Sequence, residues 1–107
     1  MVNFEQREEG FERAFSHQEE LRFKTRVRRN LLLGAWAGEK LGLTGEPLQS
    51  FVARLVERQL EGVDDEALVA ELAEKLEKRE PSISRHRIGR RLEEFSAQAL
   101  RDIQAGR

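Results

Sequence analysis

The residue types that carry out chemistry are few in this sequence and poorly spaced for it. The chain of 107 residues has no cysteine and two histidines, His17 and His86, with no carboxylates at metal-ligand spacing near either. Neighbouring carboxylates such as Glu19 and Glu20 point apart on a helix, so they form no acid–base pair. The segment 42–45 lacks the lysine of a phosphate-binding loop. We therefore expect no catalytic residue, no metal site and no enzymatic activity.

Two clusters of basic residues remain as candidates for binding. One lies at 22–29 and the other at 85–91, and their arginines could contact phosphates. Within each cluster the positions spread around a helix, and acidic residues elsewhere bring the formal net charge to -1. The clusters are therefore either charged faces that pair with the acidic segment 44–81, or a site for a nucleotide or an acidic protein surface. The candidate ligands of such a site are Arg28, Arg29, Arg85 and Arg87.

Length and composition limit the class of protein. A chain of this length forms one small domain, and its near-zero net charge creates no general attraction to nucleic acid or to a membrane. The longest apolar run, 31–38, is too short to span a bilayer, and no signal-peptide pattern is visible. The lack of cysteine fits a reducing compartment. We expect a cytoplasmic protein without membrane insertion. Salt-dependent binding of nucleic acid by 85–91 is the alternative that the charge balance disfavours.

The elements that must position these residues are helices. One long helix is predicted over 16–43, because Ser16 with Glu19 is a capping-box pattern typical of a helix start and Gly42 marks the end. Over 31–37 the apolar residues point in nearly every direction. Such a pattern predicts that other helices surround this half of the long helix.

Two glycines in this helix indicate where a neighbour approaches. Gly34 and Gly38 lie on the same predicted face as Val27 and Leu31. Because glycine has no Cβ, another backbone can come close there, at some cost in helix propensity. The sequence therefore predicts tight helix packing at these two positions.

Three shorter helices follow the long one. The second contains Pro47 in its first turn and ends at Gly62. Its apolar face consists of Leu48, Phe51, Val52, Leu55, Val56 and Leu60. Asp64 caps the third helix, which ends before Pro81, and the fourth begins at 82–84. Short connections favour antiparallel neighbours, so the predicted fold class is all-α, a compact four-helix bundle.

The segment 1–15 differs from the rest of the chain. It is charged and interrupted by Gly10, yet Phe4, Phe11 and Phe15 fall on one helical face. This stripe is too narrow to hold a stable helix alone. We expect a flexible or partly helical N-terminal arm that becomes helical when it docks, attached to a bundle domain at 16–107. The alternative is that the three Phe residues close over the bundle.

Several motifs together resemble one protein family, and the likeness covers nearly the whole chain. They are the spaced Phe residues of the arm, Arg28-Arg29-Asn30, Leu32-Leu33-Gly34 with Trp36-Ala37, Leu41-Gly42 with Thr44-Gly45, and Ser84 with His86 and Ile88. The block from Phe23 to Gly42 is the specific part. On these residues the chain resembles the zeta subunit of alpha-proteobacterial rotary ATP synthases, the ATPase inhibitor family.

The resemblance implies a function for the arm. In that family the arm inserts at a catalytic interface of the synthase head, beside the rotor, and blocks rotation in the ATP-hydrolysing direction. The implied protein is a regulatory subunit that binds the alpha, beta and gamma subunits of the head at the cytoplasmic face of the enzyme and is a monomer when free. No cofactor is required, and the bundle is associated with weak adenine-nucleotide (ADP or ATP) binding. The implied partner-binding residues are Phe4, Arg7, Glu8, Phe11, Glu12, Arg13 and Phe15.

Two departures from the family pattern affect the arm. Gly10 stands where the family often has Ala or another good helix former, and Gln18 stands where it often has Asp. Both changes weaken a pre-formed helix and so affect the expected strength of inhibition. The alternative function is that of a small adenine-nucleotide-binding helical protein with weak or no inhibitory activity, in which the arm only covers the bundle.

Overall fold

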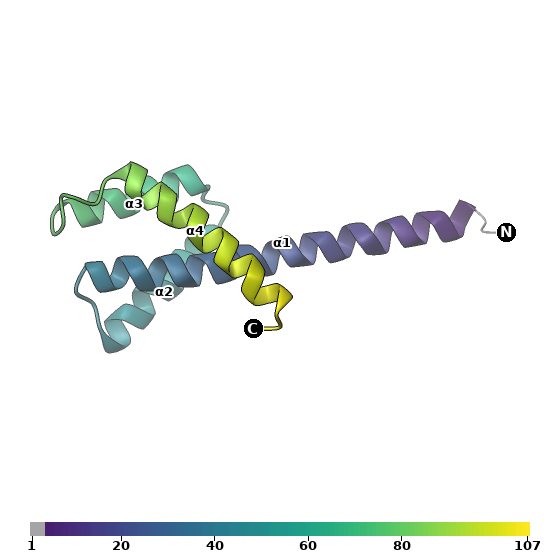
Figure 1. The fold of residues 1–107 in the computed structure, drawn as a ribbon, viewed down its shortest axis with the longest axis horizontal. Helices are drawn as coiled ribbons and strands as arrows, with labels where there is room; N and C mark the ends of the chain where they lie inside the picture. Colours follow the sequence, from purple (N-terminus) through teal and green to yellow (C-terminus); the bar gives the residue numbers. More distant parts are fainter. Residues whose placement is uncertain (1–3) are drawn as a thin grey trace.

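A single helix, α1 (Phe4–Lys40), runs the length of the molecule in this computed structural model (Figure 1). It has 37 residues and is about 55 Å long at 1.5 Å per residue, in a molecule whose longest dimension is 64 Å. The structure describes the backbone of residues 4–107 and the side chains of residues 8–107. The other helices gather around the C-terminal half of α1, and they are α2 (Gly45–Leu60), α3 (Asp65–Glu77) and α4 (Arg85–Gln104).

The predicted fold class is confirmed, because residues 4–107 form four helices and no strand, with an N-terminal arm that is helical from Phe4. The predicted start of the long helix at Ser16 is wrong, since α1 passes through Ser16 without a break. The same Ser-x-x-Glu spacing also occurs inside helices, and the surrounding residues favour helix. Pairs such as Glu9 with Arg13 and Glu20 with Lys24 bridge successive turns.

The end of α1 lies three residues earlier than predicted, at Lys40. Gly42 adopts a left-handed conformation with φ 79°. Its N–H donates to the carbonyl of Glu39, and the N–H of Leu43 donates to the carbonyl of Gly38. These two bonds form a Schellman motif, which ends a helix by satisfying its last carbonyls with the glycine just outside it.

α2 packs antiparallel against α1 at the two glycines, as predicted. A Cβ on Gly34 would lie 3.2 Å from the Cα of Val52, and one on Gly38 would collide with the side chain of Leu48. Leu31 is not buried in this helix contact, because 39% of its surface remains exposed. The prediction that the whole of 31–37 is interior is therefore wrong at Leu31.

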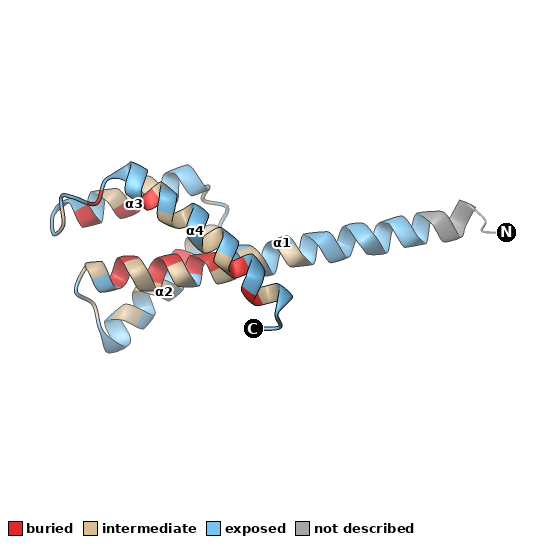
Figure 2. Cartoon of the chain, in the orientation of Figure 1, coloured by how far each residue is buried: buried red, intermediate tan, exposed pale blue. Residues whose placement is uncertain are grey.

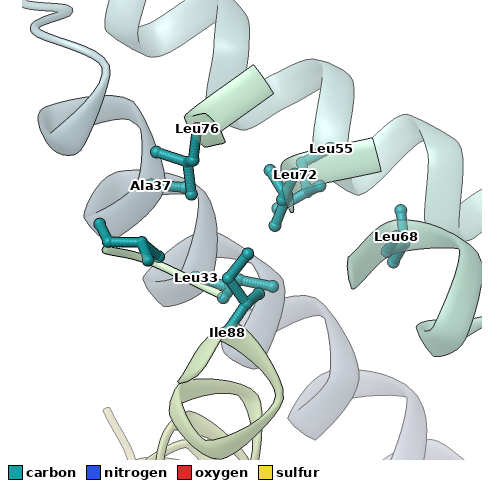
Figure 3. Packing of buried hydrophobic residues seen from close by; sticks show 8 residues of the cluster. Leu33, Ala37, Leu55, Leu68, Leu72, Leu76 and Ile88 are labelled. Carbon is teal, nitrogen blue, oxygen red and sulfur yellow. The ribbon is translucent and has the colours of Figure 1, made fainter. Parts of the chain in front are cut away.

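The core lies between α1, α2, α3 and α4, where leucines of three helices meet Ile88 of α4 (Figure 3). Its buried members are Leu33, Ala37, Leu55, Leu68, Leu72, Leu76, Ile83 and Ile88. On the α4 side, the Trp36 and Phe95 rings lie 6.5 Å apart, and the Arg91 guanidinium stacks over both. Leu60, predicted on the apolar face of α2, is instead 58% exposed at the end of that helix.

The starts of α3 and α4 follow the predicted capping residues. The Asp64 carboxylate accepts a hydrogen bond from the N–H of Ala67, and the Ser84 hydroxyl accepts one from the N–H of Arg87. Each cap satisfies one of the backbone donors that the first turn of a helix leaves open. Local sequence therefore sets where these two helices begin.

Candidate functional site

The N-terminal half of α1 projects from the bundle, and every described residue from 8 to 20 is exposed (Figure 2). Two of these residues are large and apolar. Phe11 is 73% exposed and Phe15 is 55% exposed, and the four-residue spacing places them on one face of the helix. An isolated exposed Phe is ordinary, but two aligned on a helix without other packing form a surface suited to a partner.

Five of the seven predicted partner-binding residues have described side chains, and all five are exposed on α1: Glu8, Phe11, Glu12, Arg13 and Phe15. Arg13 and Glu9 approach to 3.9 Å one turn apart. Phe4 and Arg7 lie outside the residues whose side chains the structure describes. The alternative in which the arm covers the bundle does not hold for Phe11 and Phe15, because both lie on the projecting part of α1.

The root of this projecting segment is held by α4. Near its C-terminal end α4 crosses α1, and there the buried carboxylate of Asp102 accepts hydrogen bonds from Gln98 at 2.8 Å and from Arg28 at 3.2 Å. Arg107 lies 3.6 Å from the same carboxylate. The Gln98 hydrogen bond and the Arg28 guanidinium hold the pKa of Asp102 below its ordinary value, against the opposing effect of burial. We call Asp102 with these three partners the Asp102 clasp.

Arg29 lies in a second internal contact. Its guanidinium makes a two-pronged ion pair with Asp65, at 3.0 and 2.8 Å, and its Nε donates to the side-chain oxygen of Asn30. Asn30 is fully buried and donates in turn to Gln59 of α2. Arg29 therefore pairs with the acidic middle of the chain, as one of the two interpretations of the basic clusters predicts.

A cleft of about 960 Å³ opens between α3 and α4, beside Arg29 of α1. Of the four candidate phosphate ligands, Arg29 and Arg85 line this cleft, whereas Arg28 is in the Asp102 clasp and Arg87 is exposed elsewhere on α4. Arg90, His86 and Gly89 also line it. Arg90 is not among the predicted ligands, although its position about one helical turn from Arg85 and His86 is a signal that the sequence contains.

The cleft has mixed charge, because Asp65, Glu66 and Glu93 line it together with the arginines. Among the described residues, no three His, Cys, Asp or Glu side chains converge to hold a metal ion. None of the helices over residues 4–107 is long and apolar enough to cross a membrane.

Comparison with known protein families gives a match that covers most of the chain. No curated protein and no solved structure matches the chain. The family model described as ATPase inhibitor subunit zeta matches residues 1–102, which is almost the full length. This extent includes the projecting helix, the cleft, and the Asp102 clasp except for Arg107. The chain therefore belongs to the ATPase inhibitor subunit zeta family.

Proposed function

We propose that the protein inhibits ATP hydrolysis by the head of a rotary ATP synthase, and that its effector is the segment 1–15, inserted at a catalytic interface beside the rotor. The observation that carries the proposal is the pair Phe11 and Phe15, exposed on a helix that projects from the bundle. Membership of an ATPase inhibitor family supports it. In this proposal the protein is a non-catalytic regulatory subunit, its partners are the alpha, beta and gamma subunits, and it acts at the cytoplasmic face of the enzyme.

The physical basis of the proposed contact is an amphipathic helix in a groove. Burying one Phe side chain completely contributes about 1.5–3 kcal/mol, so covering the exposed parts of Phe11 and Phe15 contributes on the order of 2–4 kcal/mol. Glu8, Glu12 and Arg13 can then pair with charges at the rim of the groove. A rigid helix held between subunits that must move past each other stops the rotation on which hydrolysis depends.

The direct test replaces the two rings. We expect the double variant Phe11→Ala, Phe15→Ala to inhibit ATP hydrolysis by the purified cognate head about 30-fold or more weakly than the full chain. The matched control is Leu100→Ala, which removes an exposed apolar side chain from α4 and should leave inhibition unchanged. Unaltered inhibition by the double variant, with helical content preserved in circular dichroism, would refute the role of the arm.

The cleft between α3 and α4 supports a second candidate function, weak binding of ADP or ATP. Arg85 and Arg90 line it and provide donors for phosphate oxygens, and a Cβ on Gly89 would meet nothing within 4 Å, so the space beside α4 is open. Calorimetric titration with ADP tests this function. Arg85→Gln with Arg90→Gln should abolish the binding signal, while Arg87→Gln, outside the cleft, should retain it. Equal signals from all variants would exclude the cleft as the site.

A further inference from the structure

A second apolar surface lies at the root of the projecting helix. There α2, which runs antiparallel to α1, reaches its C-terminal end, while α1 continues towards its N-terminal end. Gly38 faces Leu48, Gly34 faces Val52 and Leu55, and Asn30 is bonded to Gln59. Each four-residue step back along α1 therefore corresponds to about four residues forward along α2. Continuing this register places Leu60, the last residue of α2, at the level of residues 26–29 of α1. Phe23 then lies just past the end of α2.

The residues at this place are incompletely covered. Phe23 is 53% exposed, Leu31 is 39% exposed and Leu60 is 58% exposed, while Val27 is half-buried. We call these four residues the root patch. On α1 the spacing 23, 27, 31 is one helical stripe, and it continues the same face that Gly34 and Gly38 turn towards α2. The root patch is thus the uncovered continuation of the α1–α2 packing surface.

The root patch and the aromatic pair of the arm face different directions. Eight residues separate Phe15 from Phe23, which is about 12 Å along the axis and roughly 80° around it at 100° per residue. Both surfaces lie on one unbroken helix, α1. A partner that holds Phe11 and Phe15 on one side of α1 must therefore present another wall to meet Phe23.

Area and charge indicate the kind of partner. Three side chains exposed by about half offer on the order of 300 Å², well below the roughly 800 Å² that each partner contributes to a stable interface. The root patch cannot hold a second copy of the chain by itself. It can extend an interface that already holds the arm. Arg26 is exposed one turn from Phe23 and makes no ion pair with any described residue, although Asp64, Asp65 and Glu66 line the same hollow. A carboxylate on the opposing surface can therefore pair with it.

We infer that the root patch is a second docking surface for the same synthase head, contacting an apolar, acid-bordered wall next to the groove that receives the arm. This inference rests on the proposed function. It places the end of the interface near Leu31 and Leu60, on the bundle, and not at residue 15.

The test uses the full-length chain and the purified cognate head. Phe23→Gln keeps a good helix former at an exposed position, and we expect it to raise the dissociation constant about 5- to 10-fold. Leu60→Gln, on the other helix, should act in the same direction. Leu100→Gln is the control and should bind as the unmodified chain does. Binding by Phe23→Gln and Leu60→Gln that equals the control would overturn the inference.

Two further results distinguish a failure of the proposed role of the arm from a failure of the inference about the root patch. If the Phe11→Ala, Phe15→Ala variant inhibits fully while Phe23→Gln binds weakly, the proposed role of the arm fails and the root patch stands. If sedimentation shows that the free chain dimerises and that Phe23→Gln abolishes the dimer, the occupant is a second copy and the inference is overturned.

Discussion

At the scale of single residues, the buried polar side chains are those that fix α1 within the bundle. Asp102 holds the crossing of α4, and Arg29 with Asn30 links α1 to both α3 and α2. A buried carboxylate is stable only when its charge is compensated, and Gln98, Arg28 and Arg107 compensate Asp102. The base of the projecting helix is therefore held by directional contacts as well as by apolar packing.

The Asp102 clasp predicts a specific dependence of stability on pH. The pKa of Asp102 is lower in the folded state than in the unfolded state, so its contribution is present above about pH 4 and is lost as pH falls through the folded pKa. We expect Asp102→Asn to lower the free energy of unfolding at pH 7, and the curves of variant and unmodified chain to converge as the pH falls below the folded pKa of Asp102. Urea unfolding of both chains, followed from neutral to acidic pH, measures these free energies. Parallel curves would contradict the prediction.

At the scale of elements, the continuity of α1 is the main difference from the sequence-based expectation. Gly10 lies inside the helix, where a Cβ would meet nothing within 4 Å. Glycine in a helix interior costs about 1 kcal/mol relative to alanine. The segment around it is thus helical but weakened at one exposed position.

Replacing this glycine tests whether docking requires a continuous helix. We expect Gly10→Ala to tighten inhibition of the synthase head, by up to about fivefold, because less free energy is spent on ordering the arm. Inhibition curves of the two chains measured side by side provide the comparison. Gly106→Ala is unsuitable as a control because φ is 77° there, whereas Gly89→Ala makes a similar helix-interior change in α4. Unchanged or weaker inhibition by Gly10→Ala would count against a continuous docked helix.

The sequence predicted those features that depend on local signals. Asp64 and Ser84 begin their helices, and Gly34 and Gly38 admit α2, because capping and the lack of a Cβ act over short distances. The predicted start of α1 at Ser16 is wrong because a capping-box spacing also fits a helix interior. The pairing of Arg28 with Asp102, 74 positions away, depends on how α4 crosses α1, which no local pattern encodes. The cleft and the root patch also depend on how distant helices pack, so no local pattern in the sequence predicts them.

At the scale of the whole molecule, burial divides the chain into two parts. Residues 8–20 are all exposed, while the apolar core lies between Leu33 and Ile88. The predicted boundary between an arm at 1–15 and a bundle at 16–107 stays a prediction. The helix itself has no break there, so the division is one of packing and not of secondary structure.

This division predicts the stability of a shortened chain. A chain of residues 16–107 loses no described core residue, and we expect its thermal midpoint to lie within about 2 °C of that of the full chain. Calorimetry of both chains at equal concentration measures the difference. A large drop in the midpoint would show that the arm packs on the bundle in solution.

The unbroken helix also constrains how the chain can change in length. Because α1 carries the arm and one wall of the core, inserting one residue near position 18 turns Phe11 and Phe15 by about 100° relative to the bundle and shifts them by about 1.5 Å. An insertion of about seven or eleven residues returns them nearly to their original direction. A flexible linker would absorb any insertion. In this chain the arm and one wall of the core lie on the same helix, so only certain insertion lengths preserve the direction of Phe11 and Phe15 relative to the bundle.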